Sequence, residues 1–417
     1  MLPVSQAEAI IFNLVQPLDG QQNQEVVTLL TAIDRIIAVP VVSQLDFPHW
    51  DNSAMDGYAV RYEDVKHGSN EQPAVLEVVE EIAAGLSPQH FIQAGQAARI
   101  FTGAVMPSGA DTIVMQEQTR REGSSVFILA NPEPQAFVRH QASFYQAGTP
   151  LLPPRIKINA PAIAVLAAAQ CTQLTVYRRP RVAILSTGDE LVTPDQFLQP
   201  GQIVDSNQYA LAALVAQTGA EPWQVGIVPD RPEALKKAIA RAIATSDVVL
   251  SSGGVSVGDY DYVEQILVSL GASIHIRAVA VKPGKPLTVA TFSASGASNH
   301  KSVLYFGLPG NPVSALVTFW RFVQPALKKL SGLCQNWGPA FVQARSRHDL
   351  RSDGKRETYL WGQLHLVNGN YEFQVVGGSH SSGNLINLAQ TTGLAVLPVG
   401  QTFIPSGDPV QVLQVSA

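Results

Sequence analysis

The chain has 417 residues, more than the roughly 100 to 200 of one domain, so we expect two to four domains. Hydrophobic residues make up 46% and charged residues 15%, which excludes a disordered chain, and the net charge of -5 argues against a nucleic-acid or membrane-surface partner. No apolar run approaches the roughly 18 residues of a membrane span, and the first residues lack a signal-peptide pattern. We therefore expect a cytoplasmic protein.

The first 180 residues mix predicted helices with predicted strands. Residues 5–17 predict an amphipathic helix, and residues 24–45 and 158–170 predict further helical stretches. Short strands are predicted between Gly and Pro at residues 75–82, 97–101, 112–116 and 126–129. This order indicates a small β domain inserted into the N-terminal part.

Between residues 181 and 332 strands and helices alternate, which predicts a mostly parallel, doubly wound sheet covered on both faces. The predicted strands are residues 182–186, 224–228, 247–251 and 303–307. The predicted helices are residues 207–218, 232–245 and 260–270, with a last helix from Pro312 past Leu327. Residues 340–417 give about five short strands, which predict a small β barrel or sandwich.

Ligands of such sheets bind beyond the carboxyl ends of the strands. Glu190, Asp230, the loop of residues 251–261 and the loop of residues 308–314 all follow predicted strands. We therefore expect them to converge on one rim of the sheet.

The loop of residues 251–261 is a candidate anion site. Gly253 and Gly254 let the backbone approach an anion, and Ser252 and Ser256 add hydrogen-bond donors at the start of a helix. A plain strand-to-helix turn could also be rich in Gly. Three glycines and three serines within eleven residues exceed what such a turn needs.

Acidic residues border this anion site. Asp259 and Asp261 could act only on the helix dipole, and Glu190 and Asp230 taken singly could be caps or turn residues. Carboxylates are nevertheless poor neighbours for a phosphate. A divalent metal between them and the ligand resolves the conflict.

Two further turns offer groups for an anion. Lys282 and Lys285 lie on a stiff Pro-rich turn, although alone it could be a solvated basic turn, and Gly310, Asn311 and Ser314 lie at a predicted helix start. Together the motifs indicate a phosphorylated, nucleotide-bearing ligand with a metal. The sequence has neither a P-loop pattern nor a dinucleotide-binding glycine fingerprint.

Several strings, in order along nearly the whole chain, resemble the molybdopterin molybdenumtransferase family, which includes MoeA and the gephyrin E domain. They are residues 52–59, 101–104, 186–191, 205–207, 251–261, 282–286 and 308–315. The resemblance implies an α/β and β multidomain fold in four parts. These are a discontinuous N-terminal domain (1–45 and 141–180), an inserted β domain (46–140), a doubly wound molybdopterin-binding α/β domain (181–332) and a C-terminal β barrel (333–417).

The resemblance also implies an activity. Family members hydrolyse adenylylated molybdopterin with Mg²⁺ and transfer molybdate to its dithiolene, which forms molybdenum cofactor and releases AMP. Carried over by matching motif, the expected catalytic residues are Asp56, Thr102, Glu190, Asp230 and Asp261, of which the last three would hold the metal. The expected substrate-binding residues are Arg139, Ser252, Gly253, Gly254, Ser256, Asp259, Lys282, Lys285, Gly310, Asn311 and Ser314.

The expected assembly is a homodimer in which Asp56 and Thr102 face the partner's site. The adenylyltransferase that supplies the substrate is a further expected partner. One segment departs from the family pattern: after Arg139 the family continues through a Gly to a Glu-Asp pair, whereas this chain has His140 to Phe144 without them. This departure leaves open a paralogue that binds molybdopterin without turnover, and the resemblance to the gephyrin E domain leaves open a scaffold protein.

Overall fold

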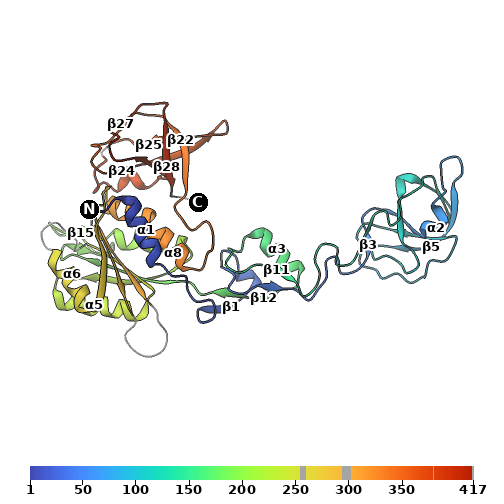
Figure 1. Ribbon diagram of the computed structural model, residues 1–417, viewed down its shortest axis with the longest axis horizontal. Coiled ribbons are helices and arrows are strands. Elements are labelled where there is room, and N and C mark those ends of the chain that lie inside the picture. Colours follow the sequence, from blue (N-terminus) through green and yellow to red (C-terminus); the bar gives the residue numbers. More distant parts are fainter. Residues whose placement is uncertain (254–259, 294–301, 379, 416–417) are drawn as a thin grey trace. The chain divides into compact units, whose positions relative to one another are not determined.

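The structure is a computed structural model that describes residues 1–253, 260–293, 302–378 and 380–415. The chain forms two compact units, which we describe separately (Figure 1). The first unit comprises Met1–Val39, Pro154–Ala160 and Gln173–Ala417, and the second comprises Pro40–Pro153 and Pro161–Thr172.

A six-stranded mixed sheet forms the centre of the first unit. Its strands lie in the order β16 (Glu221–Val228), β13 (Arg181–Thr187), β17 (Val248–Ser252), β21 (Val303–Leu308), β20 (Pro286–Phe292) and β18 (Ala272–Ala278). The first four are parallel, at the places predicted from the sequence. The last two pair antiparallel and extend the sheet beyond those four strands.

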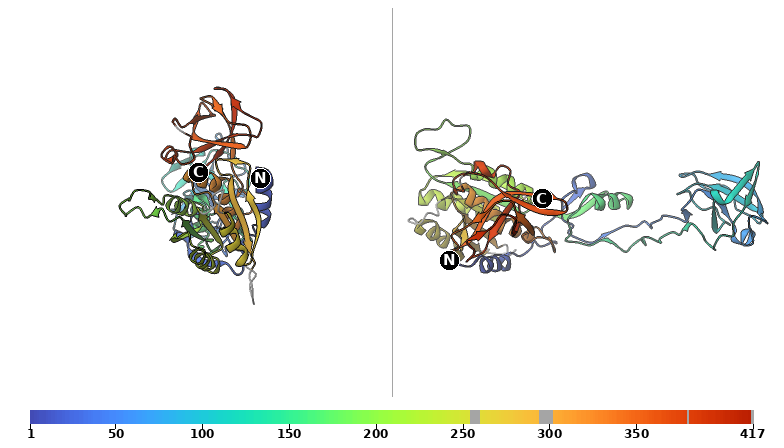
Figure 2. Two further views of the ribbon diagram at one scale, coloured as in Figure 1. Left: turned by 90° about the vertical axis from the view of Figure 1, so that its left-hand side faces the viewer. Right: turned by 90° about the horizontal axis from the view of Figure 1, so that it is seen from above.

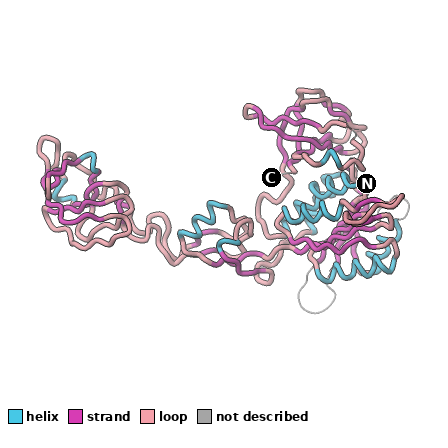
Figure 3. Tube along the Cα trace, turned by 180° about the vertical axis from the view of Figure 1, so that it is seen from behind, coloured by secondary structure: helices cyan, strands magenta, loops and turns pink. Residues whose placement is uncertain are grey.

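Helices cover both faces of this sheet, as predicted. Alternate residues of β13 show the two faces, because Val182 and Ile184 belong to one buried cluster and Ala183 and Leu185 to another. The second face is covered by α5 (Pro232–Thr245) and α6 (Tyr260–Ser269), which form the helical layer beside the sheet in Figure 3.

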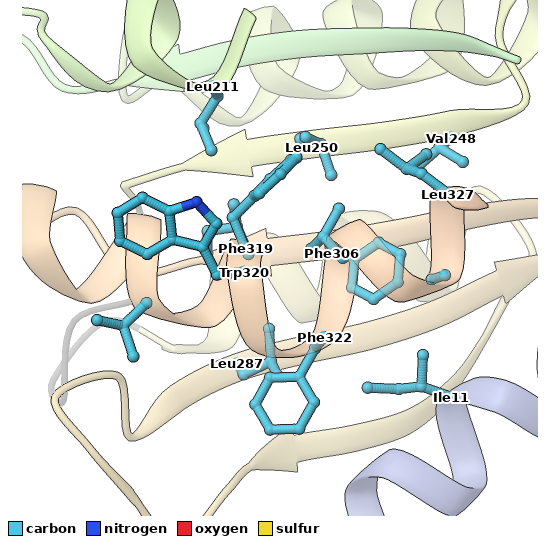
Figure 4. Close-up of a cluster of buried hydrophobic side chains, with 14 of the residues drawn as sticks. Ile11, Leu211, Val248, Leu250, Leu287, Phe306, Phe319, Trp320, Phe322 and Leu327 are labelled. Atoms are coloured by element: carbon cyan, nitrogen blue, oxygen red, sulfur yellow. The ribbon is translucent and has the colours of Figure 1, made fainter. Parts of the chain in front are cut away.

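The first face is covered by α4 (Asn207–Gln217), α7 (Pro312–Thr318), α8 (Gln324–Leu330) and the N-terminal α1 (Val4–Leu14). Figure 4 shows Ile11, Leu211, Phe306 and Phe322 among the side chains of this core. Each large side chain buried in this way stabilises the fold by about 1.5–3 kcal/mol.

The predicted helix from Pro312 past Leu327 is present with one irregular turn. A π-helical segment, Phe319–Val323, joins α7 to α8. Pro325 lies just after this segment, and a proline has no N–H for the preceding turn of an α-helix. The wider turn accommodates it.

Five strands of the C-terminal region close into a barrel. They follow one another as β24 (Glu357–Val367), β25 (Asn370–Val375), β22 (Phe341–Ser346), β28 (Pro409–Gln414) and β26 (Gly393–Leu397), and pairing of β26 with β24 completes the circle. A short strand, β19 (Val281–Lys282), runs parallel to the start of β24. The barrel therefore fixes the turn that carries Lys282. Shorter pairings join β14 (Leu191–Val192) to β15 (Ile203–Val204) and β23 (Leu350–Arg351) to β27 (Phe403–Ile404).

The second unit contains the inserted β region, drawn in cyan and blue in Figure 2. Its sheet has the order β7 (Thr112–Met115), β4 (Gly57–Val60), β6 (Gln96–Ile100), β5 (Ala74–Ile82), β9 (Ser125–Ile128) and β8 (Thr119–Glu122). The four strands predicted here are confirmed. Two short pairings, β3 (Asn52–Ser53) with β10 (Val138–Arg139) and β2 (Val41–Val42) with β11 (Pro150–Leu152), and the helix α3 (Ala160–Ala168) lie at its chain ends.

The helix predicted at residues 24–45 is wrong. The segment begins with β1 (Gln24–Thr28), which pairs antiparallel with β12 (Gln173–Tyr177), and continues with a single 3-10 turn, Leu29–Thr31. Val26, Val27 and Thr28 are β-branched, and their pairing with a distant strand decides the conformation. In the described part of the chain, no helix combines the length and apolar character of a membrane span.

Candidate functional site

A cavity of about 960 Å³ opens where β13, β17 and β21 end. Predicted site residues from the segments that follow four strands, β13, β16, β17 and β21, line it together: Glu190, Asp230, Ser252, Gly253, Gly310, Asn311 and Ser314. The sequence also placed these loops after parallel strands, whose carboxyl ends share one edge of the sheet. The roles of these residues stay predictions.

Close backbone contacts shape the floor of the cavity. Gly253 has φ +93°, and a Cβ there would lie 2.3 Å from the carbonyl oxygen of Thr187. A Cβ on Gly310 would lie 3.5 Å from the Cα of Gly253. The loops after β13, β17 and β21 therefore touch through their backbones, and an anion can approach main-chain groups there.

Asn207 joins two of these loops. It is the first residue of α4, and its Nδ2 donates to Ser252 Oγ at 2.6 Å and to the Gly310 carbonyl oxygen at 2.7 Å. Asp205 holds the start of the helix, because its Oδ1 accepts from the Gln208 backbone N–H at 3.1 Å. In the sequence, Asp205 and Asn207 belong to one of the strings that resemble the family, and Asn207 begins a predicted helix. Neither was predicted as a site residue.

Three carboxylates, those of Asp189, Glu190 and Asp230, lie close together beside the cavity. The backbone N–H of Asp230 donates to Asp189 Oδ1 at 3.2 Å. Partial removal from water, and then the negative charges of Asp189 and Glu190, raise the pKa of the Asp230 carboxyl. A divalent cation would relieve this repulsion, so Glu190 and Asp230 fit the predicted metal site.

Other predicted members of the metal and anion site belong to the segment of residues 254–261. Among the residues that the structure describes, no group of three His, Cys, Asp or Glu side chains is arranged to hold a metal. Gly254, Ser256 and Asp259 lie outside the described residues. Asp261 lies in the first turn of α6, and its side chain is not described.

The two lysines lie on the turn before β20 and are not among the residues that line the cavity. Lys282 Nζ forms an ion pair with Asp353 Oδ2 at 2.9 Å, and both side chains are partly exposed. This pair lowers the pKa of the Asp353 carboxyl, since the ammonium donates a hydrogen bond to it. Lys285 is half-buried on the same turn.

The barrel region contributes to the cavity, which the sequence reasoning missed. Asn311 Nδ2 donates to Ser382 Oγ at 3.1 Å, and the backbone N–H of Val313 donates to the Ser382 carbonyl oxygen at 3.1 Å. Gly383 and Leu385 line the cavity directly. The Gly- and Ser-rich string between β25 and β26 was the available signal.

In the second unit, Asp56 and Thr102 form a close pair. Asp56 Oδ1 accepts from the Thr102 backbone N–H at 2.8 Å and from its hydroxyl at 2.7 Å. These two bonds, helped by the charge of Arg99, hold the pKa of the Asp56 carboxyl below its ordinary value. Asp56 is therefore an anion at neutral pH, held next to a hydroxyl.

Arg139 lies half-buried on β10, opposite Asn52. The residues that follow it approach two aspartates from elsewhere in the chain: Gln141 donates its backbone N–H to Asp51 Oδ1 at 2.7 Å and its Nε2 to Asp46 Oδ2 at 2.9 Å. Carboxylates are thus present beside the altered segment.

Comparison with known proteins decides the family. The chain is 67% identical to a molybdopterin molybdenumtransferase from Nostoc sp. over 405 residues, which cover 97% of this chain and 92% of that protein. The chain belongs to the molybdopterin molybdenumtransferase family. It is also 34% identical to a molybdopterin molybdenumtransferase from Haemophilus influenzae, with 91% of each chain covered.

Family models and a solved structure agree with this membership. The MoeA N-terminal region (domain I and II) matches residues 2–169, a probable molybdopterin binding domain matches residues 183–329, and the MoeA C-terminal region (domain IV) matches residues 343–415. The crystal structure of the molybdopterin biosynthesis MoeA protein from Pyrococcus horikosii is similar over 100% of both chains, with TM-score 0.82 and 28% identity. The fold class expected for a family member is thereby confirmed, and the boundaries of the four parts stay a prediction.

Proposed function

We propose that this family member is a magnesium-dependent molybdenum insertase, which hydrolyses adenylylated molybdopterin and transfers molybdate to its dithiolene. The observation that carries this proposal is the cavity at the ends of β13, β17 and β21, where the loops of Gly253 and Gly310 meet the carboxylates of Glu190 and Asp230. Such a cavity offers close main-chain contact for phosphates and acidic groups for a cation in one place.

The reaction divides into two exchanges. Water attacks a phosphorus of the pyrophosphate, the phosphoanhydride bond breaks, AMP leaves, and molybdopterin keeps its own phosphate. The two dithiolene sulfurs then form bonds to molybdenum, while one molybdate oxygen takes up the two thiol protons and leaves as water. Positioning of the two anions and neutralisation of their charge are the main tasks of the protein.

The residues of the cavity suit these tasks. Ser252 and the backbone around Gly253 would bind phosphate oxygens, and Lys282 and Lys285 would attract the anionic substrates from the neighbouring turn. Glu190 and Asp230 would hold Mg²⁺, with Asp261 as a further proposed ligand. When bound, Mg²⁺ neutralises negative charge on the pyrophosphate oxygens.

The proposal includes the assembly of the protein and its place in the cell. We propose a homodimer in which Asp56 and Thr102 of one subunit complete the cavity of the other, and an adenylyltransferase as the partner that supplies the substrate. The reaction would take place in the cytoplasm.

The test is incubation of the purified protein with adenylylated molybdopterin, molybdate and Mg²⁺. AMP and active cofactor should both form, and a chelator should stop AMP release. A paralogue that only binds molybdopterin would retain the pterin and release no AMP, and that result would refute the proposal.

A further inference from the structure

Asn207 occupies an unusual place between the two loops that form the anion site. Its side chain is only 7% exposed, and one amide nitrogen contacts both the loop after β17, through Ser252, and the loop after β21, through Gly310. No other described hydrogen bond joins these loops through a side chain of α4. The first turn of this helix therefore ties the two loops together.

The partners of Asn207 fix the orientation of its amide. A backbone carbonyl oxygen can only accept, so the amide nitrogen must face Gly310, and Oδ1 must point the other way. Oδ1 is buried and has no partner among the described residues. A buried asparagine with a purely structural role normally has its oxygen satisfied, so an acceptor without a partner in the described part of the chain favours a role in a site.

The hydrogen bond from Asn207 also limits the partners to which the Ser252 hydroxyl can donate. Ser252 Oγ accepts from Asn207 at 2.6 Å, so its own O–H must be donated elsewhere. Within the described residues its hydroxyl donates to the Pro309 carbonyl oxygen at 3.5 Å, which is longer than a good hydrogen bond. A hydroxyl that accepts a hydrogen bond is also a stronger donor.

We propose that Asn207 is a positioning residue for the anion site. Its amide N–H donates to Ser252 Oγ, so that the Ser252 hydroxyl donates its own hydrogen bond to a phosphate oxygen in the cavity. This inference rests on the proposed function, because it assumes a phosphate-bearing ligand. Asn207 itself acts through Ser252 and through the distance between the two loops.

The experiment measures binding of inorganic pyrophosphate, which offers only anionic oxygens, by calorimetry with the full-length protein. Asn207→Ala and Ser252→Ala should each weaken binding about tenfold, the usual effect of losing one hydrogen bond to a charged group. The double variant should bind no more weakly than Ser252→Ala, because Asn207 acts through that hydroxyl. Asn207→Asp keeps the shape of the side chain but removes both of its N–H donors. The Ser252 hydroxyl would then donate to the new carboxylate instead of to pyrophosphate, so this variant should weaken binding at least as much.

Thr218→Ala is the matched control for the helix. Thr218 Oγ1 donates to the Val215 carbonyl oxygen at 2.6 Å at the opposite end of α4, so its loss disturbs the helix without touching the cavity. Pyrophosphate affinity should then stay at the wild-type value. A purely structural role of Asn207 would show as equal losses in melting temperature for the Asn207 and Thr218 variants with unchanged affinity.

Three results would overturn the inference: no pyrophosphate binding by the wild type, unchanged affinity in both Asn207 variants, or independent effects that multiply in the double variant. AMP release from adenylylated molybdopterin by the wild type is measured in parallel. If the wild type releases no AMP while the Asn207 and Ser252 variants still show their coupled loss of pyrophosphate affinity, the proposed function is refuted and the role of Asn207 stands.

Discussion

Asp230 lies where a carboxylate is electrostatically unfavourable in the free protein. Its pKa is raised above the ordinary value of 3.8, by partial removal from water and by the charges of Asp189 and Glu190. The folded state therefore binds this proton more tightly than the unfolded state. The resulting loss of stability is absent below about pH 3.8, grows as the pH rises toward the folded-state pKa, and is complete above it.

We expect Asp230→Asn to stabilise the protein slightly at pH 7 and to slow AMP release at least tenfold, since loss of a metal ligand usually costs about tenfold to a hundredfold. Melting temperatures across pH and AMP formation check both effects. The gain in melting temperature should shrink as the pH falls and vanish below about pH 3.8. The exposed Asp408→Asn serves as control, and equal behaviour of the two variants would contradict the prediction.

Lys282 is held by Asp353, which in the proposed function competes with an anionic substrate for this lysine. Its ion pair with Asp353 is partly exposed, so water and salt weaken it. Lys282→Ala should raise the KM for adenylylated molybdopterin more than it lowers kcat. Asp353→Asn should lower that KM by no more than about twofold to threefold, because an exposed pair has a small interaction energy. Steady-state kinetics check the prediction, and an effect of Lys282→Ala on kcat alone would assign the lysine to the chemical step.

At the scale of elements, the segment that leads into β13 is held by a buried ion pair. Arg178 donates through Nη1 and Nη2 to the two carboxylate oxygens of Asp247 at 2.7 and 2.8 Å, and Asp247 is 2% exposed. Arg178→Met should destabilise the protein by about 3–5 kcal/mol, because a buried carboxylate loses its guanidinium. Urea unfolding measures the change. Arg181→Met, which breaks an exposed pair with Glu221, should cost less than about 1 kcal/mol, and similar losses in both variants would be contrary to this account.

Local patterns predicted the elements whose conformation is decided locally. The helical spacing of apolar residues and the capping residues indicated α4 and α5, and short runs of apolar residues indicated the four parallel strands. β1 was mistaken for helix because its conformation depends on β12, about 150 residues further along the chain. β18 and β20 were missed because their antiparallel pairing departs from the alternation of strand and helix.

The same distinction holds for the site. Glycine loops and acids at strand ends were predictable, since each lies within a short stretch of sequence after a strand. Ser382 and Asp353 were not, because pairing of β19 with β24 and the course of the barrel loops bring them near the α/β sheet. The link from Asn207 to Ser252 and Gly310 likewise joins segments that are distant in sequence.

At the scale of the whole molecule, the predicted catalytic groups are divided between the two compact units. Asp230 and Glu190 belong to the first unit, and Asp56 and Thr102 belong to the second. In the proposed dimer each active site takes one group from each subunit. Light scattering at micromolar concentration should then give about twice the chain mass of 44.6 kDa.

A mixing experiment tests this division directly. Asp56→Asn inactivates the group that one subunit lends to its partner, and Asp230→Asn inactivates the group that it keeps, so each variant alone should be inactive. After random exchange of subunits half the dimers are mixed, and each mixed dimer carries one site with both aspartates intact. The mixture should therefore recover roughly a quarter of the wild-type rate of AMP release. The rate should rise with the same time course as subunit exchange, and Asp230→Asn mixed with Glu190→Gln, both from the first unit, should recover nothing. If that second mixture recovers as much activity as the first, or if neither does while exchange is complete, the active site is not shared between subunits.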